Sequence, residues 1–286
     1  MTGETLPSAL VRELVLRALR EDLVHQDVTT DALFDRSISA RATVVSEEPD
    51  DLILAGLDVA FGVFAEVDPD LIRRAEYADG DRLPSRAVIL TVQGDGRSIL
   101  KAERVALNFL QRLTGIATLT AKFCDAVKGT PVRILDTRKT TPGLRALEKW
   151  AVRLGGGQNH RFGLGDGILI KDNHLALADG DVAGACRRAR EHAPHGFRIE
   201  VETRTIEDVR HALHGKADII LLDNMSPAMI RNALDLIKGR ALVEVSGGVN
   251  LANIREIASA GPDFISIGAL THSAPAANLS LDLVKQ

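Results

Sequence analysis

The side chains best suited to chemistry are concentrated within residues 133–175. The whole chain has a formal net charge of −4, so the positive charge in this stretch is a local excess, which indicates a binding site for an anion. Arginine offers a planar fork that matches a carboxylate or a phosphate, and lysine adds a compact charge. The alternative is that these cations pair with nearby acids such as Glu148 and Asp172. The candidate side chains are Arg138, Lys139, His160, Arg161, Lys171 and His174.

Two carboxylates end apolar segments further along the chain. Glu202 ends the sequence IEVE, and Asp223 ends IILLD. Such a pair opposite a cationic wall can hold Mg²⁺ or sugar hydroxyls, and it can stabilise an oxocarbenium-like transition state. We interpret Glu202 rather than Glu200 as functional, and we expect one of the two to face the interior and the other the outer layer. A structural salt bridge to the basic residues is the alternative.

Glycine-rich turns follow the last two apolar segments. The sequence VEVSGGVN covers residues 243–250, and ISIGALTHS covers residues 265–273. In parallel α/β barrels, the loops after the last strands often bind phosphate through backbone N–H groups. We therefore interpret both turns as candidate phosphate sites, with tight turns that bind no ligand as the alternative.

A regular alternation of strands and helices positions these residues. Short apolar segments separated by helical ones indicate βαβ units and a parallel sheet. The predicted strands cover residues 132–136, 167–171, 197–202, 218–222, 241–246 and 263–268, and the predicted helices cover residues 143–154, 179–191, 205–214, 226–237 and 251–260.

Six parallel strands could form an open doubly wound sheet or an incomplete barrel. A barrel gathers the carboxyl ends of its strands at one mouth, whereas an open sheet spreads them along an edge. Polar or small residues end nearly every predicted strand, which favours the barrel. We therefore predict an α/β fold with a C-terminal incomplete parallel barrel of about six strands, similar to a TIM barrel. The strand-end residues are Asp136, Lys171, Glu202, Asp223, Ser246 and Gly268.

The region before the barrel has a mixed pattern that is typical of an α+β domain. Apolar spacing predicts a helix over residues 8–20 with Ser8 as its N-cap. Residues 98–127 are strongly helical, but Thr114 and Gly115 interrupt them, which predicts two helices. The other predicted elements are strands over residues 41–46, 51–55, 72–77 and 87–96 and a helix over residues 57–66.

These patterns predict two domains. An N-terminal α+β domain is expected over residues 1–115 and the barrel domain over residues 116–274. The tail, residues 275–286, alternates apolar and polar side chains and is expected to return to the first domain.

The composition excludes several classes of protein. Aromatic residues make up 3% of the chain, which argues against a platform for stacking nucleic-acid bases. Cys124 and Cys186 have no metal-ligand spacing and are interpreted as packing residues. We find neither a signal peptide nor an apolar run that could span a membrane, so a cytoplasmic location is the expectation.

The ordered motifs of the chain resemble those of the quinolinate phosphoribosyltransferases, also called nicotinate-nucleotide pyrophosphorylases. The resemblance covers roughly residues 8–280 and is carried by ERVALNFLQRLTGIAT, LDTRKTTPGLR, GGGQNHRFGLGDGILIKDNH, IEVE, LLDN and VSGGV. It implies an open-faced sandwich before the barrel. It also implies that quinolinate and phosphoribosyl pyrophosphate react with Mg²⁺ to give nicotinate mononucleotide, pyrophosphate and CO₂ in de novo NAD synthesis. Finally, it implies a homodimer with shared active sites, which could assemble further.

The resemblance also implies roles for individual residues. Lys139, Lys171, Glu202 and Asp223 are the expected catalytic residues, and the last two are also the expected Mg²⁺ ligands. Arg104 would reach in from the partner subunit, although on sequence alone it is a solvated helix charge. The residues expected to bind substrates are Arg104, Thr137, Arg138, Lys139, His160, Arg161, Lys171, Glu202, Asp223, Ser246, Gly247, Gly248, Gly268, Ala269 and Leu270.

Other functions stay open at this point. One is a related barrel phosphoribosyltransferase that acts on another anionic substrate, such as a protein of molybdate-linked operons. A second is an aldolase or isomerase with Lys171 as a Schiff-base lysine. A third is a protein that binds an anion without turnover.

Overall fold

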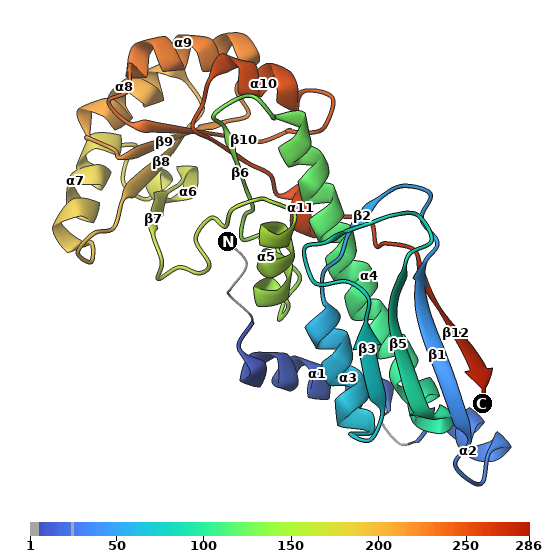
Figure 1. Cartoon of the computed structure of the whole chain (residues 1–286). Helices are drawn as coiled ribbons and strands as arrows, with labels where there is room; N and C mark the ends of the chain where they lie inside the picture. Colours follow the sequence, from blue (N-terminus) through green and yellow to red (C-terminus); the bar gives the residue numbers. More distant parts are fainter. Residues whose placement is uncertain (1–5, 24–25) are drawn as a thin grey trace. The chain divides into compact units, whose positions relative to one another are not determined.

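The structure is a computed structural model that describes residues 6–23 and 26–286 (Figure 1). Its contacts divide the chain into two compact units, each built from segments that are distant in sequence. None of the described helices is both long and apolar enough to cross a membrane. The first unit contains residues 1–121, 141–156 and 273–286, and the second contains residues 122–140 and 157–272.

A four-stranded antiparallel sheet, in the order β12-β1-β5-β3, forms the centre of the first unit. Ala40, Ala42 and Val44 are buried on alternate positions of β1, so one face of the sheet covers the core. The tail was expected to return to this region, and β12 does pair with β1 along its length. The strands of this unit are β1 (Ser39–Ser46), β2 (Leu52–Ile53), β3 (Ile72–Ala75), β4 (Arg82–Leu83), β5 (Val88–Asp95) and β12 (Leu279–Lys285).

The helices α1 (Ser8–Asp22) and α3 (Leu57–Val67) pack against each other. At Gly62 the two helices come close, and a Cβ atom there would make ordinary van der Waals contact with Val15 at 3.5 Å. Ser8 is not the N-cap that the sequence predicted: α1 begins at Ser8, and Pro7 holds the N-cap position without a side-chain hydrogen bond. The short helix α2 (Val28–Leu33) is capped by Asp27, whose carboxylate accepts from the N–H of Thr30.

The prediction of two helices over residues 98–127 is wrong, because α4 (Gly96–Ala126) is one continuous helix. Its apparent interruption has a packing role. The Thr114 hydroxyl donates to the carbonyl of Ala55 and accepts from the N–H of the same residue. A Cβ atom at Gly115 would collide with the carbonyl oxygen of Pro275. The glycine is therefore required by the close approach of another chain segment and does not end the helix.

The helix α5 (Arg145–Leu154) belongs to the first unit, whereas the sequence analysis placed it in the barrel domain. Its Glu148 is fully buried and accepts hydrogen bonds from the Arg112 guanidinium at 2.8 Å and the Thr141 hydroxyl at 2.7 Å. A buried carboxylate requires such partners, so α5 is held to α4 by a specific ion pair.

The second unit is a six-stranded parallel sheet in the order β6-β11-β10-β9-β8-β7, which confirms the predicted strand number and direction. The first strand along the chain pairs with the last, as closure of a barrel requires. The ladder is open between β6 and β7, so the barrel is incomplete. The strands are β6 (Arg133–Leu135), β7 (Ile168–Ile170), β8 (Ile199–Thr203), β9 (Ile219–Asp223), β10 (Leu242–Ser246) and β11 (Phe264–Ser266).

Helices between residues 182 and 260 cover the outer side of these strands (Figure 1). The helix α6 directly follows Lys171 and was not predicted, because its five residues are too few to show a periodic pattern. The predicted helix over residues 179–191 begins later, at Val182, with Asp181 as its N-cap. The helices are α6 (Asp172–Ala176), α7 (Val182–His192), α8 (Ile206–His214), α9 (Pro227–Ile237), α10 (Ile254–Ala260) and α11 (Ala269–His272).

Candidate active site

A cavity of about 350 Å³ opens at the carboxyl ends of the barrel strands. Every residue that lines it belongs to the second unit. The structure therefore brings together most of the side chains that the sequence analysis selected, from segments up to about 130 residues apart. The lining residues are Thr137, Arg138, Lys139, His160, Arg161, Leu169, Lys171, Glu202, Leu221, Asp223, Glu244, Ser246 and Ser266.

The cations of the cavity are not paired with the acids that were the alternative partners. Glu148 is bound to Arg112, and Asp172 pairs with Arg204 at 2.8 Å. Arg138 has a buried Nε atom without a hydrogen-bond partner among the described residues. This donor needs an acceptor, which an anionic ligand would supply.

The guanidinium of Arg161 lies near that of Arg138. Burial and the charge of Arg138 lower the pKa of Arg161, while Glu200 and Asp166 oppose this shift. One of its nitrogens donates to the carbonyl of Gly167 at 3.2 Å. A guanidinium group whose charge is destabilised by a second one nearby forms a local site in which an anion is favourable.

The opening between β6 and β7 is filled by the segment that carries His160. Gln158 bonds to the backbone of β6 on both sides, donating to Ile134 and accepting from Asp136. The buried carboxylate of Asp136 then accepts from the Asn159 amide at 2.6 Å and from the N–H of His160 at 2.9 Å. The motif GGGQNHR thus behaves as an additional strand-like segment, and Asp136 fixes the position of its functional end.

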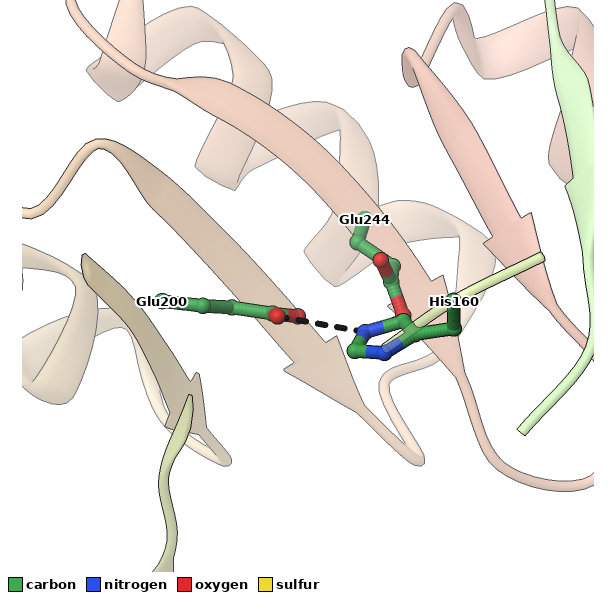
Figure 2. A group of neighbouring side chains, drawn as sticks. All are labelled: His160, Glu200 and Glu244. Carbon is green, nitrogen blue, oxygen red and sulfur yellow. Dashed lines mark ion pairs between the residues drawn. The ribbon is translucent and has the colours of Figure 1, made fainter. Parts of the chain in front are cut away.

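His160 lies between two buried glutamates, and we name His160, Glu200 and Glu244 the floor cluster (Figure 2). Its Nε2 atom is 3.1 Å from a carboxylate oxygen of Glu200 and 3.6 Å from one of Glu244. Its Nδ1 atom accepts the N–H of Arg161 at 2.8 Å. His160 is therefore held on both ring nitrogens while it lines the cavity.

The expectation that Glu200 and Glu202 face opposite sides of β8 is wrong. Side chains alternate along a strand with a period of two, so residues two apart share a face. Glu200 reaches His160, and Glu202 lies 3.2 Å from the Lys171 ammonium, so both side chains point into the barrel at successive levels. Glu202 lies at the mouth, as expected of a functional residue.

We name Glu202 and Asp223 the rim carboxylates. Arg204 contacts both, with nitrogen–oxygen distances of 3.7 Å to Glu202 and 3.5 Å to Asp223. Two carboxylates on adjacent parallel strands offer the hard oxygen ligands that Mg²⁺ prefers, with room for water and phosphate oxygens to complete its coordination. The rim carboxylates already have cationic side chains as partners, so their surroundings suit a metal cation such as Mg²⁺.

The two glycine turns also border the mouth. Gly247 and Gly248 both have positive φ values, +88° and +65°, so this turn requires residues without a side chain. A Cβ atom at Gly268 would lie 2.9 Å from Cδ of Lys139, so the glycine makes room for that lysine. Ala269 and Leu270 begin α11 directly after it, and Leu270 is buried.

Two candidate residues have other positions. Arg104 lies on α4 in the first unit, is more than half exposed and comes within 4.0 Å of Glu103. His174 accepts the N–H of Lys171 at 2.8 Å, so it caps α6 as a structural residue.

Four further residues shape this site: Asp136, expected only as a strand end, Glu200, set aside in favour of Glu202, and Glu244 and Arg204, which were not predicted. A signal for two of them exists in the sequence. Glu200 and Glu244 each stand two positions before a mouth residue inside an otherwise apolar strand, and an isolated charge in a buried strand requires a partner. Nothing comparable marks Arg204, which is a common surface residue type in a loop.

Comparison with known protein families agrees with this architecture. The family model described as "Quinolinate phosphoribosyl transferase, C-terminal domain" matches residues 116–282, and the corresponding N-terminal domain matches residues 27–114. The chain belongs to this family. The junction of the two family domains coincides with the predicted boundary at residue 115, within α4.

Relatives from distant organisms have similar sequences over nearly their whole length. The chain is 44% identical over 278 residues to the "nicotinate-nucleotide pyrophosphorylase [carboxylating]" of Mycobacterium leprae, covering 95% of this chain and 96% of that protein. It is 41% identical to a probable enzyme of the same name from Methanothermobacter thermautotrophicus, covering 95% and 98%. The solved structure of the nicotinate-nucleotide pyrophosphorylase from Francisella tularensis has a TM-score of 0.92 and 38% identity, covering 98% of each chain.

Proposed function

We propose that this protein transfers the phosphoribosyl group of phosphoribosyl pyrophosphate to quinolinate, with loss of CO₂. The products are nicotinate mononucleotide, pyrophosphate and CO₂, and the reaction belongs to de novo NAD synthesis. The observation that carries this proposal is the cavity at the barrel mouth, where a cationic wall faces a carboxylate pair in a chain of the quinolinate phosphoribosyltransferase family.

The cationic wall suits quinolinate, which carries two neighbouring carboxylates. Arg138 and Arg161 supply forked donors for them, and His160 lines the same cavity. Lys139 and Lys171 add charge that both substrates share, because phosphoribosyl pyrophosphate is also an anion. Thr137, at the end of β6, accepts the N–H of Lys139 at 3.0 Å and so shapes this turn.

The rim carboxylates suit the second substrate. Glu202 and Asp223 would hold Mg²⁺ and the ribose hydroxyls, and the metal would supply positive charge to the diphosphate. The turns formed by residues 246–248 and residues 268–270 would hold the 5′-phosphate through backbone N–H groups. Their glycine conformations support this role, since they allow the backbone to approach a ligand closely.

The chemistry requires positioning more than a dedicated base. The bond from ribose C1 to the diphosphate breaks, the diphosphate leaves with the electron pair, and the ring nitrogen of quinolinate forms the new bond. Lys171 and the rim carboxylates lie where charge develops, and a preorganised charged site stabilises that change. The positive ring nitrogen then accepts electron density as the adjacent carboxylate leaves as CO₂, and the vacated ring carbon takes up a proton.

We further propose a homodimer in which Arg104 of one subunit contacts the substrate of the other, and a cytoplasmic location. Arg104 is exposed on α4, so it is accessible to a second chain. Mixing Arg104→Ala with Lys171→Ala protein should restore part of the activity, because the heterodimer contains one intact site. Subunit exchange without recovered activity contradicts the shared site.

The direct test is an assay with quinolinate, phosphoribosyl pyrophosphate and Mg²⁺. We expect nicotinate mononucleotide, pyrophosphate and CO₂ in equal amounts, and no product when nicotinate replaces quinolinate, because one carboxylate is then missing. Folded protein that releases no CO₂ under these conditions contradicts the proposal. Borohydride trapping at Lys171 with a carbonyl substrate would instead support a Schiff-base enzyme.

A further inference from the structure

The floor cluster is a buried layer between two cavities of the barrel. The side chains of His160, Glu200 and Glu244 are 13%, 6% and 2% exposed. Above the cluster lies the cavity of the proposed active site. His160 and Glu244 line that cavity, and a second cavity of about 580 Å³, at the amino ends of the strands, is lined by all three residues. Three titratable groups therefore meet at a buried position that borders both cavities.

The geometry alone admits a metal ion, because one ligand atom from each residue lies within 4.8 Å of the others. The hydrogen bonding of His160 argues against it. Nδ1 accepts the N–H of Arg161, and a ring nitrogen that accepts a hydrogen bond carries no hydrogen. The hydrogen of the neutral ring is then on Nε2, the atom that faces the glutamates. A metal on Nε2 would force the hydrogen onto Nδ1, against the N–H of Arg161.

The hydrogen on Nε2 of His160 gives Glu200 and Glu244 different hydrogen-bonding roles. Nε2–H lies 3.1 Å from an oxygen of Glu200 and 3.6 Å from one of Glu244, so Glu200 is its acceptor. One oxygen of Glu200 and one of Glu244 are buried without a hydrogen-bond partner among the described residues. A second ionised carboxylate here would add repulsion and leave both oxygens without a donor. A proton on Glu244 would remove one of the two negative charges. It would also supply a hydrogen-bond donor within the group of side chains drawn in Figure 2.

We propose that Glu244 holds a proton in the ligand-free protein up to the neutral pH range, that Glu200 and Glu244 are positioning residues for His160, and that a dicarboxylate bound in the cavity above strengthens the hold of Glu244 on its proton. This inference rests on the proposed function, because quinolinate is the dicarboxylate. The role is indirect: neither glutamate needs to touch the reacting atoms.

The groups that face Glu244 support this state. Burial and the charge of Glu200 on β8 raise its pKa, whereas the Ser266 hydroxyl on β11, Lys171 after β7 and any positive charge on His160 lower it. The result is a pKa raised to about 7. Below that pH Glu244 is neutral, and above it the cluster gains a negative charge beneath the anion site. Quinolinate affinity should therefore fall as the pH rises through this range.

The first experiment measures proton uptake when quinolinate binds. Isothermal titration calorimetry in two buffers of different ionisation enthalpy, from pH 6 to 9, gives the number of protons taken up. We expect the wild-type protein to take up a fraction of a proton above pH 7 and to lose about tenfold in affinity by pH 9, if binding raises the pKa of Glu244 by about one unit. Glu244→Gln is neutral at every pH and should lose both effects.

A matched control is Glu207→Gln, which removes an exposed glutamate from α8 and should behave as the wild type. Equal proton uptake by the wild-type and Glu244→Gln proteins overturns the inference while the proposed function stands. Absence of quinolinate binding at every pH counts against the proposed function instead, and the second experiment then decides the inference alone.

The second experiment examines the free protein by nuclear magnetic resonance. We expect one glutamate carboxyl carbon to titrate near neutral pH and to be absent from Glu244→Gln, and His160 to show a protonated Nε2 and an unprotonated Nδ1 at pH 7. Glu200→Ala should shift the His160 signals, because Nε2–H loses its acceptor. A His160 protonated on Nδ1, or Zn²⁺ added alone that binds with loss of the Nε2 proton, overturns the inference.

Discussion

The barrel contains two pairs of carboxylates at successive levels, and they differ in what neutralises them. Glu202 and Asp223, the rim carboxylates, lie near the ammonium of Lys171 and the guanidinium of Arg204. The floor glutamates are Glu200, two positions before Glu202 on β8, and Glu244 on β10. Both are buried, and among the described residues the group within salt-bridge distance of them is the imidazole of His160. The negative charge of the rim carboxylates is thus balanced by cationic side chains. In our inference, one carboxylate of the floor cluster is neutralised by a proton instead.

The difference follows from depth along the strand. Two residues move a carboxylate by about 6.6 Å along a parallel strand, which is enough to take it from the mouth into the interior. At the mouth, water and ions can replace the present partners, so the rim suits a site that exchanges ligands. In the interior, desolvation makes a second charge costly, so the floor suits a fixed hydrogen-bond arrangement.

Removing the shared cation of the rim should have the largest effect. Lys171→Ala is expected to lower kcat by about 10²–10³-fold, as loss of one preorganised charge at a reacting centre does. Stability should change little, because the Lys171 side chain is 46% exposed. Steady-state kinetics with both substrates measures the loss, and Lys122→Ala, an exposed lysine of α4, is the control. A kcat within twofold of the wild type contradicts the role of Lys171.

Asp136→Ala should disturb the position of His160 in the floor cluster and lower the stability of the protein. The carboxylate of Asp136 is buried and holds both Asn159 and His160, so its loss leaves two donors without an acceptor. We expect the free energy of unfolding to fall by about 1–3 kcal/mol and quinolinate affinity to weaken. Denaturant unfolding and calorimetry measure the two effects. Asp136→Asn, which keeps one acceptor, should be milder, and unchanged affinity in Asp136→Ala would separate Asp136 from the site.

Gly268→Ala tests the rim without removing a charge. The added methyl group would lie 2.9 Å from Cδ of Lys139, so the lysine must move. We expect KM for phosphoribosyl pyrophosphate to rise about tenfold, equivalent to about 1.4 kcal/mol, with little loss of stability. Gly165→Ala is the control, because a Cβ atom there meets nothing within 4 Å. Equal kinetics of the two variants would show that the position of Lys139 is unimportant.

Arg204→Gln should give the smallest change, and in the opposite direction. Arg204 is 58% exposed and contacts both rim carboxylates, so it would compete with the proposed Mg²⁺. Exposed ion pairs contribute roughly 0.2–1 kcal/mol, so Mg²⁺ should bind about two- to fivefold more tightly to the variant in calorimetry. Arg210→Gln, which removes an exposed arginine paired with Glu207, is the control. Weaker Mg²⁺ binding by Arg204→Gln would mean that the arginine assists the metal.

The repetitive half of the fold is readable from the sequence because its strands are short, apolar and regularly spaced. The mouth residues Lys171, Glu202 and Asp223 could be located by one rule, that parallel strands bring their carboxyl ends together. The glycine at position 268 was also found this way. Its specific reason, the proximity of Lys139, depends on tertiary contacts.

The predictions that were wrong concern residues whose type is explained by contacts with distant parts of the chain. Gly115 has the features of a helix break, yet it is required by the approach of Pro275, about 160 residues later. Glu148 occupies a helix that suited the barrel alternation, and its burial against Arg112 places that helix in the first unit. The expectation for Glu200 was wrong for another reason. Residues two apart on a strand share a face, whereas Glu200 and Glu202 were expected on opposite faces.

The pairing of β12 with β1 has a consequence for how the protein is made in the cell. A ribosome adds roughly 5–20 residues per second, so β1 emerges on the order of tens of seconds before the strand that completes its sheet. During that time an edge of β1 has unpaired N–H and C=O groups that could pair with another chain. This edge of β1 is therefore open to pairing with another chain until residues 279–285 have been made.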